Sequence, residues 1–172
     1  RAVAEEILRR RVKVKWSATL HPLNIDSDDI RTLRRSGFSM ASLGSDSGSP
    51  AMLTHLRKGF YIEEVSSLIN LLRENGITFY LSIMIGGPGE TRSTVEESIR
   101  FAIKVNASMT AFRIGIRITP LTGLHQTALE EGVVKPGQNL LEPCFYVSNS
   151  IRDWAAAFLH SNFDGNPRIL IQ

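Results

Sequence analysis

Cysteine is almost absent from this chain, because Cys144 is the only one among its 172 residues. A single thiol cannot form an internal disulfide, which predicts a reducing, cytoplasmic compartment rather than a secretory one. No apolar run approaches the ~18 residues that cross a bilayer, and no basic-then-apolar leader opens the sequence. We therefore expect a cytoplasmic protein with no membrane partner.

A strong charge of either sign is also lacking. The formal net charge of +3 is small and its cations are dispersed, which argues against a nucleic-acid partner. The four histidines share no short spacing, so we expect no metal site among them. No serine, histidine and acid trio stands out, and the sequence alone assigns no catalytic residue.

Short apolar segments alternate with amphipathic ones, which predicts strand-helix units and a parallel sheet. The length falls short of the ~250 residues of a complete eight-unit barrel. We therefore expect an α/β fold, a partial TIM-type (β/α) barrel of about four to five mainly parallel strands. Residues 1–148 would form this barrel, and 149–172 a C-terminal helix and tail. Because the chain enters at Arg1 in mid-helix, we also expect a piece of a longer protein.

Local patterns place the elements. Ser27 is predicted to cap one helix and Gly37 to end it, while Ser93 and Glu96 have the spacing of a capping box. The segment 77–85 predicts a strand buried on both faces. The full set of predicted strands is 12–20, 39–43, 77–85 and 110–118, and helices are expected at 50–57, 62–75 and 124–131, after Ser27 and Ser93, and in the tail.

Asp46 follows the second predicted strand, at the end where barrel enzymes place their active groups. With Ser45 and Ser47 beside it, its carboxylate suits a ribose diol or an ammonium group. The alternative is that Asp46 caps the next helix, which Ser49 and Pro50 would begin. Both interpretations fit the sequence.

Cations and glycines follow at two further points. Arg57 and Lys58 end the short helix, where they fit either a ligand carboxylate or the helix dipole. The turn Gly86-Gly87-Pro88-Gly89-Glu90-Thr91 leaves the most apolar strand, and its glycines allow backbone to approach a ligand closely. It lacks the lysine of a phosphate loop and the spacing of a dinucleotide fingerprint. A backbone rim against an adenine fits it better.

Arg113 and Arg117 lie four residues apart in the fourth predicted strand. Period-two geometry would put both side chains on one face. Burying an unpaired charge is costly, so cations within an otherwise apolar strand favour the wall of a wet or anionic site.

In order along the chain, four blocks resemble the later part of radical S-adenosylmethionine (SAM) proteins, most closely the branch with a cobalamin-binding domain ahead of the barrel. The resemblance covers about residues 14 to 148. The blocks are Gly-Phe-Ser-x-x-Ser-Leu-Gly-x-Asp-Ser-Gly-Ser, Leu-x-x-Leu-Arg-Lys-Gly, Ile-Gly-Gly-Pro-Gly-Glu-Thr and Arg-Ile-Gly-Ile-Arg-Ile-x-Pro-x-Thr.

The resemblance implies S-adenosylmethionine as a small-molecule cosubstrate. Asp46, beside Ser45, would stand where the family has a glutamate contacting the ribose or methionyl end, and Lys58 or Arg57 would lie near the carboxylate. Gly86, Gly87 and Pro88 would line the adenine. Arg113 or Arg117 would face the pocket.

The family's three-cysteine motif is not in this sequence, so the iron-sulfur cluster and cobalamin would be held only through an N-terminal part. We expect a fragment of an iron-sulfur oxidoreductase or transferase whose parent cleaves S-adenosylmethionine to a deoxyadenosyl radical for methylation, cyclisation or a related reaction. The isolated chain would be inactive. The alternative is a non-catalytic α/β binding or assembly module. Exposed sheet edges further predict a homo-oligomer.

Overall fold

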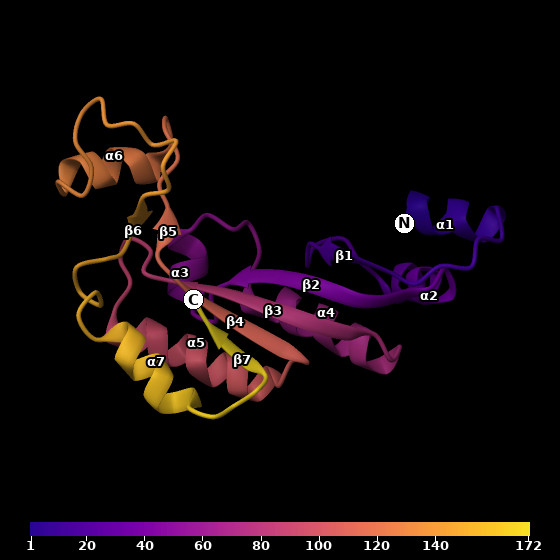
Figure 1. Cartoon of the computed structure of the whole chain (residues 1–172). Coiled ribbons are helices and arrows are strands. Elements are labelled where there is room, and N and C mark those ends of the chain that lie inside the picture. The colour runs from indigo at the N-terminus through magenta and orange to yellow at the C-terminus, as the bar shows by residue number, and fades with distance from the viewer.

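The computed structural model describes residues 1–172 and contains a five-stranded parallel sheet in the order β1-β2-β3-β4-β7 (Figure 1). This confirms the α/β prediction. The sheet strands are β1 (Trp16–Leu20), β2 (Phe38–Asp46), β3 (Thr78–Ile85), β4 (Met109–Ile114) and β7 (Ile169–Ile171). The helices are α1 (Ala2–Arg9), α2 (Ser27–Arg35), α3 (Pro50–His55), α4 (Ile62–Glu74), α5 (Arg92–Val105), α6 (Gly123–Glu130) and α7 (Ala155–Phe163). None of these helices has the length and apolar character needed to cross a membrane.

Helices cover one face of the sheet. In Figure 1, α4, α5 and α7 lie along the same side of the strands, and their apolar stripes pack against alternate strand residues. The main core joins α4 residues such as Leu68 and Leu72 to Leu81 and Ile83 of β3. We call the opposite side of the sheet the inner face, because it corresponds to the inside of a (β/α) barrel.

The prediction that the third strand is buried on both faces is wrong. Along β3, Phe79, Leu81, Ile83 and Ile85 are buried, whereas the residues between them are only half-buried. The buried set points at the helices. The alternation arises because no layer of helices covers the inner face (Figure 1).

The predicted N-caps of two helices are wrong, because a neighbouring residue caps each helix. The N-cap of α2 is Asp26, whose carboxylate accepts from the Asp29 N–H, and Ser27 is the first helical residue. The N-cap of α5 is Thr91, which forms a capping box with Thr94 in place of Ser93 and Glu96. In both cases an equally good capping residue stands one or two positions earlier and also has extended backbone.

The predicted fourth strand, 110–118, is broken at Gly115. Gly115 has φ +94°, and the chain there leaves the sheet to form β5 (Ile116–Arg117), which pairs antiparallel with β6 (Phe145–Tyr146). We call residues 115–147 the arm. It carries α6, has a small core of its own, and extends beyond the carboxyl ends of β3 and β4 (Figure 1).

After the arm the chain returns to the sheet. α7 lies against the same face as α5, and β7 pairs in parallel with β4, from Thr110 opposite Ile169 to Phe112 opposite Ile171. Phe163 of α7 stacks on Phe112 at 5.2 Å between ring centroids. The short apolar run 169–171 is therefore a fifth sheet strand.

Candidate functional site

The inner face is built by residues that pair across the strands in rows. Paired residues of parallel neighbours point to the same side of a sheet, so the register defines this surface. Its members are Ser17, Thr19, Met40, Ser42, Gly44, Thr78, Tyr80, Ser82, Met84, Met109, Ala111, Arg113 and Leu170. No Asp or Glu is among them.

One row across β2, β3 and β4 is made of small side chains and continues to a leucine on β7. Gly44 pairs with Ser82, Ser82 with Ala111, and Ala111 with Leu170. Barrel interiors are usually filled at such positions by Val, Ile and Leu. Small residues on three neighbouring strands keep this row free of bulky side chains, and Ala111 among them is fully buried.

A β-bulge aims Asp46 at the carboxyl end of the sheet. The β2–β3 register shifts between Gly44 and Asp46, so that Ser45 is the extra residue. Asp46 then adopts a left-handed conformation with φ +60°, which aspartate tolerates better than most side chains. Bulges of this kind re-aim side chains and are frequent beside active sites.

Lys58 is the partner of Asp46. Its ammonium forms an ion pair with Asp46 Oδ2, and the two side chains are only 27% and 17% exposed. The Lys58 Nζ also lies 5.7 Å from the centroid of the Phe60 ring, and that ring makes an edge contact with His21 at 5.3 Å. The structure therefore brings two predicted site residues together and adds an aromatic wall.

The helix-capping interpretation of Asp46 is wrong. Ser49 is the N-cap of α3 and Pro50 follows it at the first turn, as predicted, but no side chain caps that helix. Ser47 instead bonds with Ser98 of α5 at 3.1 Å, and the Gly48 N–H donates to the same Ser98 oxygen at 3.0 Å. Asp46 is thus left to pair with Lys58.

A buried carboxylate holds the glycine-rich turn. Glu90 is 2% exposed; its Oε2 accepts from the Gly86 N–H at 3.0 Å and its Oε1 from the Thr94 hydroxyl at 2.8 Å. Burial raises the pKa of Glu90, and the donors from Gly86 and Thr94 oppose that rise. The sequence suggested only that Glu90 begins the following helix, so this internal anchor was missed.

The glycines of the turn are required by packing. A Cβ on Gly87 would lie 3.1 Å from Met52 Cε and 3.3 Å from Ile116 Cδ1, and one on Gly86 would meet the Gly115 nitrogen at 3.3 Å. Gly86 also has φ +115°. The turn, including half-buried Pro88, is therefore seated against α3 and the arm, with Glu90 behind it.

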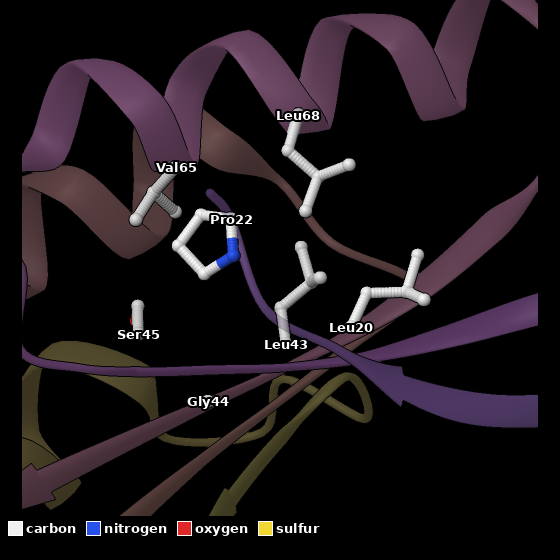
Figure 2. Close-up of a pocket in the computed structure, with 7 residues that line it drawn as sticks. All are labelled: Leu20, Pro22, Leu43, Gly44, Ser45, Val65 and Leu68. Atoms are coloured by element: carbon white, nitrogen blue, oxygen red, sulfur yellow. The ribbon is translucent and has the colours of Figure 1, made fainter. Parts of the chain in front are cut away.

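Ser45 lies on the helix side of β2. It is buried, its Oγ donates to the Ser82 carbonyl at 3.4 Å, and Figure 2 shows it beside Leu43 and Val65 at a small cavity between the sheet and α4. The cavity holds about 10 Å³, space for one water molecule. Ser45 thus points away from the inner face.

Arg113 and Arg117 lie in different strands, β4 and β5, on either side of Gly115. Arg113 pairs with Met84 and projects, exposed, from the inner face. Arg117 is exposed on β5, opposite Phe145 in the arm. The expectation that both share one strand face is wrong, because Gly115 ends the strand between them. Exposed Arg57 makes no ion pair.

The sequence profile of the radical SAM superfamily matches residues 2–102. The chain belongs to this superfamily. The family brings with it S-adenosylmethionine as a cosubstrate and a 4Fe–4S cluster, as the resemblance predicted.

The chain matches only part of the length of each curated relative. A tryptophan 2-C-methyltransferase of Streptomyces laurentii is 26% identical over 116 residues, which are 64% of this chain and 19% of that protein. An anaerobic magnesium-protoporphyrin IX monomethyl ester cyclase of Rubrivivax gelatinosus is 29% identical over 107 residues, covering 61% of this chain and 19% of that one. The chain therefore spans about a fifth of the curated relatives it matches.

Solved structures share the fold. The methyltransferase TsrM of Kitasatospora setae, with cobalamin and a 4Fe–4S cluster bound, superposes with a TM-score of 0.83 at 21% identity, over 99% of this chain and 42% of that one. Coproporphyrinogen III oxidase HemN of Escherichia coli gives 0.66 at 17% identity, over 93% and 36%. These likenesses confirm the barrel-like fold.

The family's cluster does not fit the residues of this chain. Cys144 is the only thiol, and no group of three His, Cys, Asp or Glu side chains converges anywhere in the structure. For S-adenosylmethionine the chain offers a carboxylate and an ammonium at Asp46 and Lys58, and the backbone of the glycine-rich turn.

Proposed function

We propose that this chain supplies the S-adenosylmethionine-binding part of a radical SAM enzyme. The observation that carries the proposal is that two polar features lie at the carboxyl end of the sheet, the Asp46–Lys58 pair and the anchored Gly86–Glu90 turn. Asp46 ends β2 and the turn follows β3, and a row of small residues crosses β2, β3 and β4 on the inner face. Parallel strands in a barrel deliver their ends to one mouth, where substrates bind.

Each proposed contact matches the chemistry of one part of the cosubstrate. Asp46 would accept hydrogen bonds from the ribose hydroxyls or the methionyl ammonium, and Lys58 would donate to the methionyl carboxylate. The backbone of Gly86, Gly87 and Pro88 would form the rim for the adenine. Arg113 would face the pocket from the inner face, whereas Ser45 and Arg117 would support it from outside.

The whole protein would use the cosubstrate for a radical methylation, a cyclisation or a related reaction. Methyltransferases and cyclases among the relatives support this range. The cluster and cobalamin would come from another part of the protein, and the isolated chain would be inactive. Its reconstitution with iron and sulfide should leave it colourless; an absorbance near about 400 nm, typical of thiolate-ligated clusters, would contradict this assignment.

Titration calorimetry with S-adenosylmethionine tests the proposed site directly. Lys58→Met and Asp46→Asn each remove a charged partner, and hydrogen bonds to charged groups contribute about 1.5–3 kcal/mol, so affinity should fall at least about tenfold. Lys104→Met and Asp164→Asn make the same changes at exposed positions outside the proposed site and should bind as the wild type does. Equal losses in all variants, or no binding by the folded wild type, would refute the site.

We also propose that the chain self-associates through its sheet edges. β1 pairs on one side only, with β2, and β7 only with β4. Unpaired strand edges are templates for a second copy. Light scattering should show a mass that rises with concentration, and Thr19→Lys on β1 should lower it. A monomer at every concentration would exclude this assembly.

A further inference from the structure

The chain between α1 and β1 forms a groove with the C-terminal end of α2. The groove holds about 410 Å³ and is lined by residues 12–15 and 35–37. It lies at the amino end of the sheet, beside α1 and α2, whereas the arm and the proposed cosubstrate site lie at the carboxyl end (Figure 1). A ligand in this groove would therefore occupy a second, separate surface.

Positive charge gathers in this groove and on its rim. All the cations there are exposed and none forms an ion pair. They are Arg11, Lys13, Lys15, Arg34 and Arg35. The sequence has no Asp or Glu from residue 7 to residue 25 or from 30 to 45, and Glu6 already pairs with Arg9 and Arg10. The charge of the groove is therefore uncompensated, and it attracts an anionic partner.

The backbone of residues 12–15 has one covered edge and one open edge. This stretch contains no helix, turn or bend, so it is extended and continues β1. The Trp16 N–H donates to the Gly37 carbonyl at 3.2 Å, and a Cβ on Gly37 would lie 1.9 Å from the Val14 oxygen. Because backbone groups of alternate residues point to the same edge of an extended chain, those of Lys13 and Lys15 point to the other edge. Neither of their N–H groups donates a hydrogen bond.

The side chains give the open edge a chemical pattern. Lys13 and Lys15 share one face of the extended stretch, and Val12 and Val14 share the other. The two valines are 51% and 40% exposed. Opposite charges across neighbouring strands stabilise their pairing. A complementary strand would therefore alternate, with carboxylates opposite the lysines and β-branched side chains opposite the valines.

We propose that this edge binds an acidic, extended segment of a partner protein, which is added as a strand beside residues 12–15. Unpaired backbone groups supply the hydrogen bonds of such an addition, and alternate side chains select the partner. A second copy pairing through the same stretch would set lysines against lysines, which is destabilising. A nucleic acid or a lipid surface would use the cations but leave the N–H groups and the valines unpartnered. The inference goes beyond the proposed function and does not rest on it.

The experiment measures binding of the fluorescein-labelled peptide Thr-Glu-Val-Glu-Thr-Glu to the whole chain by fluorescence anisotropy. The wild type should bind it more tightly than Glu-Glu-Glu-Thr-Val-Thr, because only the alternating order puts all the carboxylates on one face of a strand. The double variant Lys13→Gln, Lys15→Gln should lower the affinity about threefold to tenfold, as expected for two exposed charge pairs. Lys104→Gln with Lys135→Gln, which removes the same charge from exposed positions of α5 and the arm, should bind as the wild type does.

Amide hydrogen exchange on the same complex separates strand addition from simple attraction of charge. The amides of Lys13 and Lys15 should exchange at least about tenfold more slowly when the alternating peptide is bound, because each then donates a backbone hydrogen bond. No binding, equal binding of the two peptides, equal losses in both double variants or unchanged exchange would each overturn the inference. So would stronger binding of oligothymidylate or of phosphatidylserine vesicles, which would assign the cations to phosphate groups. None of these measurements involves S-adenosylmethionine, so this inference and the proposed function can fail separately.

Discussion

Replacing Glu90 with alanine should destabilise the fold through the glycine-rich turn. The change removes the acceptor of the buried Gly86 N–H, 3.0 Å away. An unpaired buried donor costs about 1–3 kcal/mol. The Thr94 hydroxyl is not left unpaired, because it also donates to the Thr91 carbonyl at 2.9 Å. We therefore expect the free energy of unfolding to fall by about 1–3 kcal/mol, measured by urea denaturation.

Glu90→Gln is the matched control, because it keeps an oxygen for the Gly86 N–H and nearly the same volume. Its free energy of unfolding should stay within about 1 kcal/mol of the wild type. If the alanine variant is as stable as the wild type, or the glutamine variant as unstable as the alanine one, the Gly86 hydrogen bond does not anchor the turn and this reasoning is refuted.

The pH dependence of the same comparison has a definite sign. Burial raises the pKa of Glu90 above its ordinary value of 4.5, so the folded chain holds this proton to a higher pH than the unfolded chain does. The ionised side chain then costs stability above the folded pKa. As the pH falls through the folded pKa toward 4.5, the wild type should gain stability relative to Glu90→Gln. A constant difference would indicate no raised pKa.

Two further predictions concern packing and the arm. Gly48→Ala should lower the free energy of unfolding by about 1–3 kcal/mol, because its Cβ would lie 2.5 Å from Phe101 Cβ and 2.8 Å from the Ser98 backbone; Gly132→Ala, with open space around it but φ +71°, should report backbone strain alone, and equal losses would refute the clash. Burial and the Glu131 carboxylate raise the pKa of Tyr146 to about 12. Absorbance at alkaline pH should therefore show a late-ionising tyrosine that Tyr146→Phe removes, and the stability that this contact gives should be present at neutral pH and fade as the pH rises toward 12.

The sequence was a good guide to the sheet and a poor one to its irregularities. Alternating apolar residues predicted β3 to within one residue and α4 likewise. The first strand begins at Trp16 rather than at residue 12, because exposed residues 12–15 alternate as a strand does but pair with nothing. Periodicity describes a chain segment and not its neighbours, so it also extended the fourth strand through Gly115.

The site was predicted in part for a similar reason. Asp46 and Lys58 were predicted as site residues from their places after a strand and a short helix; the structure pairs them with each other, and their role toward a ligand stays a prediction. The side on which Ser45 lies depends on a one-residue bulge, which depends in turn on the β3 register and leaves no local signal. The row of small residues did leave a local signal in the sequence. Ser82 and Ala111 are small residues within strongly apolar strands, and Gly44 is a small residue in β2.

The two ends of the arm are fastened to consecutive carbonyls at the tip of β3. The Gly115 N–H donates to the Ile85 oxygen at 2.7 Å, and the Ser148 N–H to the Gly86 oxygen at 2.9 Å. The arm thus leaves the sheet and returns to it at two adjacent peptide groups, and it has a separate core of its own. Its length and composition can change in evolution or by grafting without moving the strands, which makes it a natural cassette for altering what the neighbouring mouth accepts.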